Sequence, residues 1–173
     1  MNRNSDLYTR MSEVLEAIFP LVSRAYQKYP IPVGLTRMAS AFMGCVVNIG
    51  SAEIPVQTEP HRDVKESVFG VSCLCPFGDY SQSGIILWEL EMVIELAAGD
   101  LLFFPDSLIH HSNEPVSGKR HSIVAFTQQN VFDYWKRKYG FKDKKMIVKI
   151  RRKRNRNPRV PLQPFRKKQF RSV

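Results

Sequence analysis

A histidine and a carboxylate two positions apart are the first residues of this sequence that could do chemistry. They are His61 and Asp63, in the segment Pro-His-Arg-Asp. Residues i and i+2 of a strand or extended loop face the same way, so both side chains can reach one metal ion. The same pair is common in proteins that bind no metal. It therefore indicates a metal site only together with further ligands.

A further imidazole is available later in the chain, where His110 and His111 precede Ser112 and Asn113. Two imidazoles and one carboxylate on one face leave coordination positions open. This arrangement suits Fe(II) that also binds a co-substrate and oxygen. On spacing alone either histidine could be the third ligand, because a slip of one residue in strand register exchanges them.

Arg120 and Ser122 are the next pair with the spacing of one strand face. Together they can hold the distal carboxylate of a dicarboxylate co-substrate, because a planar guanidinium makes two charge-assisted hydrogen bonds to a carboxylate. The ordered set of His-x-Asp, a Gly-Asp turn, His-Ser-Asn and Arg-x-Ser is far more specific than any of its parts. We therefore interpret these residues as one site.

Short strands must position these residues. The chain first shows apolar residues at three- and four-residue spacing between Ser5 and Tyr29, which predicts an amphipathic helix broken or ended at Pro20. Apolar runs then predict strands at 41–49, 69–75, 85–90, 92–96, 101–104 and 122–126. Turn signals predict reversals at 50–51, 76–84, 98–100 and 115–118. This spacing favours a sandwich or barrel over a parallel sheet with crossover helices.

Two elements are predicted after these strands. Residues 131–139 can form a short closing helix, and the alternation of Met146, Val148 and Ile150 allows one more strand. We divide the chain into an N-terminal helical flank at 1–38, a β-rich core at 39–143 and a basic C-terminal tail at 144–173.

The charge of the chain is concentrated near its C-terminal end. The formal net charge is +10, but residues 136–173 hold 17 of the 26 Lys and Arg residues against Asp143 as their acid, so the remainder is acidic. A field of this kind is typical of a contact to nucleic-acid phosphates. A solubilising or targeting tail is the alternative interpretation.

The composition indicates one compact domain of 173 residues, of which 43% are hydrophobic. No apolar run is long enough to cross a bilayer and the N-terminus lacks a signal-peptide pattern, so we expect neither a membrane protein nor a secreted one. We also expect an intracellular location and a monomer. The three cysteines, Cys45, Cys73 and Cys75, lie in apolar segments. They give little support to a disulfide framework or a zinc ribbon, and we expect buried, reduced thiols.

Taken together, the motifs resemble the Fe(II)- and 2-oxoglutarate-dependent dioxygenases of the double-stranded β-helix fold, and within them the TET/JBP-like branch with its compact fungal-type members. The resemblance covers residues 39–135 and rests on the segments 60–63, 85–90, 98–103, 108–113, 120–122 and 126–128. It implies a mainly β fold with flanking helices around a jelly-roll, cupin-like core. The N-terminal helix and the basic tail lie outside its motifs.

The resemblance also implies the metal ligands. His61 and Asp63 would bind iron, and the distal histidine of the family precedes a Ser-Asn or similar pair, which favours His111 as the third ligand. His110 then becomes a candidate for orienting a ligand. Strand alternation turns His121 away from the site.

The same comparison implies how the co-substrate is held. Arg120 would bind the far carboxylate of 2-oxoglutarate with Ser122 as its helper. Asn48, on a predicted strand ahead of the His-x-Asp loop, is a further candidate for contact with the co-substrate. The alternative for Asn48 is a strand-end asparagine that makes a local turn.

The implied reaction consumes 2-oxoglutarate and oxygen, releases carbon dioxide and succinate, and oxidises a C–H bond. In the TET/JBP-like branch that bond belongs to a methylated nucleobase, with 5-methylcytosine in DNA, oxidised to 5-hydroxymethylcytosine, as the first candidate. A duplex hides this methyl group, so the base must be flipped out or presented on a single strand. The basic tail would hold the backbone, and in a eukaryote we expect a nuclear location.

Two alternatives stay open. The chain has little beyond a helix and a tail with which to grip a duplex, so a related dioxygenase could instead act on alkylated bases or on a protein side chain. A non-catalytic nucleic-acid-binding β-barrel is the second alternative. The complete set of ligands and Arg120 argues against it, because a decayed site should have lost at least one of them.

Overall fold

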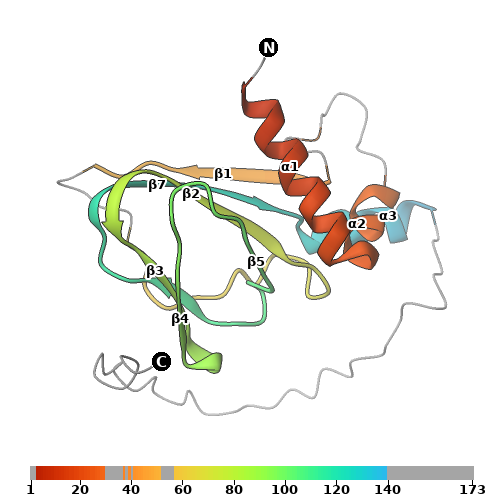
Figure 1. Cartoon of the computed structure of the whole chain (residues 1–173). Helices are drawn as coiled ribbons and strands as arrows, with labels where there is room; N and C mark the ends of the chain where they lie inside the picture. Colours follow the sequence, from red (N-terminus) through yellow and green to blue (C-terminus); the bar gives the residue numbers. More distant parts are fainter. Residues whose placement is uncertain (1–2, 30–36, 38, 40, 52–56, 140–173) are drawn as a thin grey trace, which may run out of the picture. The chain divides into compact units, whose positions relative to one another are not determined.

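The computed structural model describes residues 3–29, 37, 39, 41–51 and 57–139 (Figure 1). The predicted strand around Met146, Val148 and Ile150 and the basic tail lie outside the described residues. The division into flank, core and tail at residues 38 and 143 therefore stays a prediction.

Two antiparallel sheets form the centre of the described structure (Figure 1). The four-stranded sheet has the order β1-β7-β2-β5, and the three-stranded sheet has the order β4-β3-β6. The bounds are β1 Gly44–Asn48, β2 Ser72–Gln82, β3 Gly84–Leu87, β4 Met92–Glu95, β5 Leu102–Phe104, β6 His111–Asn113 and β7 Ser117–Phe126. Strands far apart in sequence are neighbours in both antiparallel sheets, and apolar residues of the two sheets share one buried cluster, so the predicted jelly-roll fold class is confirmed.

Two segments predicted as turns are parts of long strands. β2 continues through 76–84 as far as Gln82, and β7 already begins at Ser117 inside the predicted reversal 115–118. The two strands pair from Cys73 to Gln82 of β2. This pairing gives the backbone N–H and C=O groups of the segment hydrogen-bond partners on a distant strand, and these outweigh its local preference for a turn. Gly78 and Gly118 have φ of 117° and 108°, which lets the paired backbones depart from regular strand geometry.

The three-stranded sheet also differs from the prediction. The strand expected at 85–90 ends at Leu87, and Trp88–Leu90 form a short 3-10 helix that is closed by Glu91 in the left-handed region, with φ of 52°. β6 was not predicted, because its three polar residues carry no apolar alternation. It exists through its pairing with β3, which aligns His111 with Leu87.

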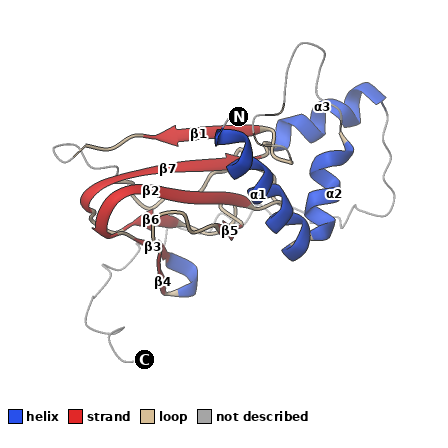
Figure 2. Ribbon diagram, turned by 45° about the horizontal axis from the view of Figure 1, so that its top comes forward, coloured by secondary structure: helices blue, strands red, loops and turns tan. Residues whose placement is uncertain are grey.

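Three helices flank the sheets: α1 Arg3–Ile18, α2 Pro20–Lys28 and α3 Gln129–Tyr139 (Figure 2). The predicted break at Pro20 is confirmed, since proline lacks an N–H and is suited to the first position of α2. The predicted closing helix is also confirmed, with its start two residues earlier. Among the described residues, no helix combines the length and the apolar character that a membrane span requires.

The alternation of side chains along β2 and β7 gives the four-stranded sheet two different faces. Cys73, Cys75 and Ala125 pack with Met11 and Leu15 of α1 in one buried cluster. Leu74 and Val124 belong to a second cluster, in which they meet apolar residues of the three-stranded sheet. The helices therefore cover one face of this sheet, and the other face is turned to the inside of the jelly roll. The prediction of buried thiols is confirmed for Cys73 and Cys75, while Cys45 is half-buried.

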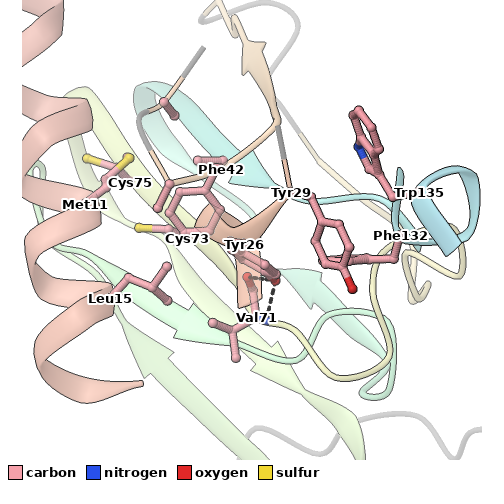
Figure 3. Close-up of a cluster of buried hydrophobic side chains, with 13 residues drawn as sticks. Met11, Leu15, Tyr26, Tyr29, Phe42, Val71, Cys73, Cys75, Phe132 and Trp135 are labelled. Atoms are coloured by element: carbon pink, nitrogen blue, oxygen red, sulfur yellow. Dashed lines mark hydrogen bonds between the residues drawn. The ribbon is translucent and has the colours of Figure 1, made fainter. Parts of the chain in front are cut away.

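Hydrogen bonds of the Tyr26 side chain connect α2 to the segment before β2 within the cluster beside the helices (Figure 3). Tyr26 is 2% exposed. Its hydroxyl donates to the carbonyl oxygen of Val71 and accepts from the N–H of Val71, both at 3.0 Å. One side chain of α2 thus satisfies both backbone groups at the residue that precedes β2. Gly70 leaves room for it, because a Cβ at this position would lie 2.0 Å from the Tyr26 oxygen.

Replacement of Tyr26 by phenylalanine should lower the free energy of unfolding by about 2–4 kcal/mol, because it leaves a buried N–H and a buried C=O without partners. Urea unfolding measures this loss. Tyr134→Phe is the matched control, since Tyr134 is 39% exposed and its hydroxyl contacts the exposed Lys138. Equal stability of the two variants would contradict a fastening role for Tyr26.

Candidate functional site

The two sheets and the loop that precedes β2 together line one cavity of about 550 Å³. Strands β1, β2 and β7 supply one wall, and Ile85 of β3 and His111 of β6 supply part of the other. The segment from Thr58 to Glu66 completes the lining. The polar residues predicted from the sequence and the inner faces of the strands therefore meet in one place.

His61, Asp63 and His111 converge on the wall of this cavity. One potential ligand atom from each lies within 4.8 Å of the other two. The Nε2 atom of His111 is 3.6 Å from Oδ2 of Asp63, and the two imidazole centroids are 4.4 Å apart. The spacing argument for His61 and Asp63 is thus met by the structure, and a histidine from a distant strand joins them.

Backbone hydrogen bonds explain why two distant segments meet here. The N–H of His61 donates to the carbonyl of His111 at 3.1 Å, and the N–H of His111 donates to the carbonyl of His61 at 2.9 Å. Nearby, both the N–H and the hydroxyl of Thr58 donate to Oδ1 of Asn113 at 2.8 Å. The loop that carries His61 is therefore attached along β6.

The orientation of the two imidazoles is suited to metal binding. Nδ1 of His61 lies 2.7 Å from the carbonyl oxygen of Glu59, and Nδ1 of His111 lies 3.1 Å from that of Ile109. A carbonyl accepts only, so it holds the proton on Nδ1 and leaves Nε2 free for a metal. Burial also lowers the pKa of His111, which favours the neutral form that a ligand needs.

His110 is turned away from the other two histidines. Its Nδ1 and its backbone N–H both contact the carboxylate of Glu89, which belongs to the 3-10 helix. The carbonyl groups of Glu59 and Ile109, rather than His110, therefore orient the two imidazoles. The register of β6 places His111 in the cavity beside His61 and Asp63, while its role as third ligand stays a prediction.

Arg120, Ser122 and Asn48 line the same cavity. Alternation along β7 directs Arg120 and Ser122 inward, and β1 pairs Asn48 with Ser122, so the Nδ2 of Asn48 donates to the Ser122 hydroxyl at 3.1 Å. His121, between them, faces the other way, where its Nδ1 accepts the N–H of Gly50 and its ring contacts Phe77. The expected outward orientation of His121 is confirmed.

The guanidinium of Arg120 is buried but incompletely paired. The residue is 3% exposed, and its Nε and Nη2 have no hydrogen-bond partner within the part of the chain that the structure describes. Burial lowers the pKa of Arg120, whereas the neighbouring Tyr80 hydroxyl favours its charged form. A buried cation with open donors is costly unless an anion pairs with it, so this wall of the cavity fits a carboxylate.

Two further carboxyl groups in the cavity wall were not found from the sequence. Glu66 and Asp106 are 8% and 3% exposed, and burial raises the pKa of Glu66 to about 8 and that of Asp106 to about 6. In sequence they resemble ordinary loop and turn acids, because their burial depends on contacts with distant segments. The backbone of Glu66 forms an isolated antiparallel β-bridge with that of Gln128, and the backbone carbonyl of Asp106 accepts the N–H of Asp63.

The metal-free protein should lose stability as the pH rises from 7 to 8. The pKa of Glu66 rises on folding from 4.5 to about 8, so the folded state holds the proton more tightly than the unfolded state does. The free energy of unfolding therefore falls as the pH rises toward 8. The slope is at most about 1.4 kcal/mol per pH unit. Urea unfolding in the presence of a chelator measures it.

Glu66→Gln is the test of this assignment, since glutamine keeps the shape and does not ionise. The raised pKa of Asp106 is about 6, so Asp106 is largely ionised at pH 7. Between pH 7 and 8 the change in stability therefore comes mainly from Glu66. The variant should be nearly independent of pH between 7 and 8. A slope equal to that of the unaltered chain would show that Glu66 is already ionised in the fold.

The comparisons with known proteins show the fold. No protein-family model matches this sequence, and no curated protein matches it. The structure is similar to a solved structure of NgTET1 in complex with 5mC DNA, with a TM-score of 0.65 and 15% sequence identity. The match covers 75% of this chain and 50% of the NgTET1 chain, so this chain spans about half the length of that protein. At this identity the likeness establishes the jelly-roll fold, and the interpretation of the cavity depends on its own residues.

Proposed function

We propose that this protein is an Fe(II)- and 2-oxoglutarate-dependent dioxygenase that oxidises 5-methylcytosine in DNA to 5-hydroxymethylcytosine. One observation carries the proposal. The cluster of His61, Asp63 and His111 and the incompletely paired guanidinium of Arg120 line the same cavity of a jelly roll. A metal site and an anion site on one cavity are what a chelating dicarboxylate requires.

The three ligand residues fit Fe(II). Two neutral imidazoles and one carboxylate leave coordination positions open for a co-substrate and oxygen. His61 and His111 would each present Nε2, with Nδ1–H held by a backbone carbonyl. Bound Fe(II) supplies the oxidative decarboxylation of 2-oxoglutarate by oxygen, with release of succinate and carbon dioxide. The task of the protein is to hold the reactants in place.

Arg120 and Ser122 would hold the far carboxylate of 2-oxoglutarate. The guanidinium offers Nε–H and Nη2–H, which form the planar fork that matches a carboxylate. The Ser122 oxygen already accepts from Asn48, so its own proton is free to be donated to the ligand. Asn48 then acts by orienting Ser122. Apolar Leu74 and Val124 on the same wall exclude water, which strengthens the ion pair.

A methylated nucleobase is the substrate that the comparison and the charge favour. The similar fold belongs to a protein solved with 5mC DNA. Residues 136–173 have the excess of Lys and Arg that backbone binding needs. The base would enter the cavity flipped from a duplex or from a single strand, and a nuclear location would follow in a eukaryotic host.

Mass spectrometry of nucleosides tests this function. The protein is incubated with Fe(II), 2-oxoglutarate and methylated DNA or RNA, single- or double-stranded, and Zn(II) replaces Fe(II) in the control because it has no redox chemistry. We expect 5-hydroxymethylcytosine and succinate in the reaction with Fe(II) and neither product in the reaction with Zn(II). Loss of an alkyl group from a damaged base, or a hydroxylated protein, would identify one of the alternative substrates. Salt-sensitive DNA binding without Fe(II)-dependent succinate release from any substrate would identify a non-catalytic binding protein.

A further inference from the structure

Three exposed side chains on either side of Asp63 lie at the mouth of the cavity. The N–H of Glu66 donates to the carbonyl of Asp63 at 2.8 Å, which closes a β-turn with Val64 and Lys65 at its tip. Val64 is 70% exposed, the highest value among the large hydrophobic residues in the described ranges. Arg62 and Lys65 are exposed as well, and all three side chains line the cavity. We call residues 62–65 the mouth turn.

The mouth turn is fixed in place on both sides. The N–H of Asp63 donates to the carbonyl of Asp106 at 3.0 Å, and the N–H of Gln129 donates to the carbonyl of Lys65 at 2.9 Å. Just beyond the turn, the N–H of Ser67 donates to the carbonyl of Thr127 at 3.0 Å. A surface that is held this way loses little conformational entropy when it binds a partner. The exposure of Val64 is therefore a property of a rigid element.

The two cations of the mouth turn are available to a partner. The salt bridges found within the described part of the chain include neither Arg62 nor Lys65. Residues 1–135 contain more acidic than basic residues, so two cations that flank a cavity without an acidic partner stand out. Their placement favours an anionic ligand that runs across the mouth.

We propose that the mouth turn receives the substrate strand, with Val64 packed on the base next to the one that enters the cavity and with Arg62 and Lys65 on the flanking phosphates. The inference rests on the proposed function and names how its substrate is held. A base that leaves the stack exposes the apolar face of its neighbour, and an aliphatic side chain can cover that face. Cations beside it bind phosphates in any sequence. An acidic peptide would pair with the cations but would leave Val64 uncovered, so a nucleic acid fits better.

The contact of Val64 is tested with oligonucleotides that carry 2-aminopurine beside 5-methylcytosine, because 2-aminopurine fluoresces more strongly when it is unstacked. The full-length protein without iron should raise the fluorescence severalfold. Val64→Asp should reduce this rise at least about fivefold, because a carboxylate cannot replace the apolar contact, while Val64→Leu should keep it. A full rise with Val64→Asp would overturn the role of Val64.

The contacts of the two cations are tested by fluorescence anisotropy with the same oligonucleotides. Arg62→Gln with Lys65→Gln should weaken single-strand binding about tenfold and reduce the slope of log K against log salt by about 1.4, since each phosphate contact on a single strand contributes about 0.7. Arg24→Gln with Lys119→Gln is the matched control, because it removes two exposed cations of the same types at other places. Equal losses in the two double variants would mean that net charge alone matters, and would overturn the proposal.

Fe(II)-dependent succinate release without nucleic acid separates this inference from the proposed function. This release is measured on the unaltered protein. If that protein releases succinate but no oligonucleotide raises the 2-aminopurine signal, the mouth-turn proposal fails and the oxygenase proposal stands, with a protein substrate favoured. If it releases none, the proposed function fails, and the fluorescence and salt measurements still decide whether the turn binds a strand.

Discussion

Replacement of Asp63 by alanine is expected to abolish iron-dependent oxidation and leave the fold intact. Asp63 supplies the only carboxylate of the His61, Asp63 and His111 cluster. Loss of a group that merely orients a ligand costs about 10- to 100-fold in metal affinity or activity, so loss of a ligand should lower turnover by more than about 100-fold. The side chain is 43% exposed and fills no core volume, so its removal creates no buried void.

Three measurements together check this prediction. Titration with Fe(II) or Mn(II) should show weakened metal binding, succinate release should fall to background, and urea unfolding of the metal-free protein should shift by less than about 1 kcal/mol. The control is Asp133→Ala, which removes a carboxylate of similar exposure on α3 that contacts Lys136. Metal binding and turnover equal to those of the unaltered chain would exclude Asp63 as a ligand.

Replacement of Arg120 by lysine should raise the KM for 2-oxoglutarate by about 10- to 100-fold and change kcat little. A hydrogen bond to a charged group contributes about 1.5–3 kcal/mol, and a lysine ammonium cannot reproduce the planar fork of the guanidinium. Saturating 2-oxoglutarate should therefore restore most of the rate. The split between KM and kcat distinguishes loss of a binding contact from general damage to the fold.

Lys119→Gln is the control for Arg120→Lys, because the neighbouring side chain on β7 is exposed while Arg120 points into the cavity. It should leave the KM unchanged. The prediction would be contradicted by an unaltered KM in Arg120→Lys, or by a fall in kcat that no concentration of 2-oxoglutarate restores. In the first case another group must hold the carboxylate.

Much of the candidate site could be predicted from the sequence because its residues obey local rules. His61 and Asp63 are two positions apart in the loop that precedes β2, and Arg120 and Ser122 are two positions apart on β7. The period of two that strands impose on side chains places Arg120 and Ser122 on one face, and the same rule for extended loops indicated that His61 and Asp63 could share a metal ion. The choice of His111 over His110 needed the resemblance, because register depends on which strand β6 meets.

The features that could not be predicted arise from contacts between distant segments. β2 continues through a proline- and glycine-bearing stretch because β7 pairs with it over its length. Glu66 and Asp106 look like surface acids in sequence, yet the fold leaves them only 8% and 3% exposed. The contact of Asn48 with Ser122 likewise depends on the pairing of β1 with β7. Local propensity contains none of this information.

The reciprocal backbone pair between His61 and His111 has a consequence beyond chemistry. An ion held by both residues would act as a cross-link between the loop ahead of β2 and β6, two segments separated by most of the jelly roll in sequence. Because such an ion binds the folded chain and not the unfolded one, it stabilises the fold by an amount that grows with the logarithm of its concentration above the dissociation constant. Scarcity of iron in a cell would then shorten the lifetime of the protein as well as silence it.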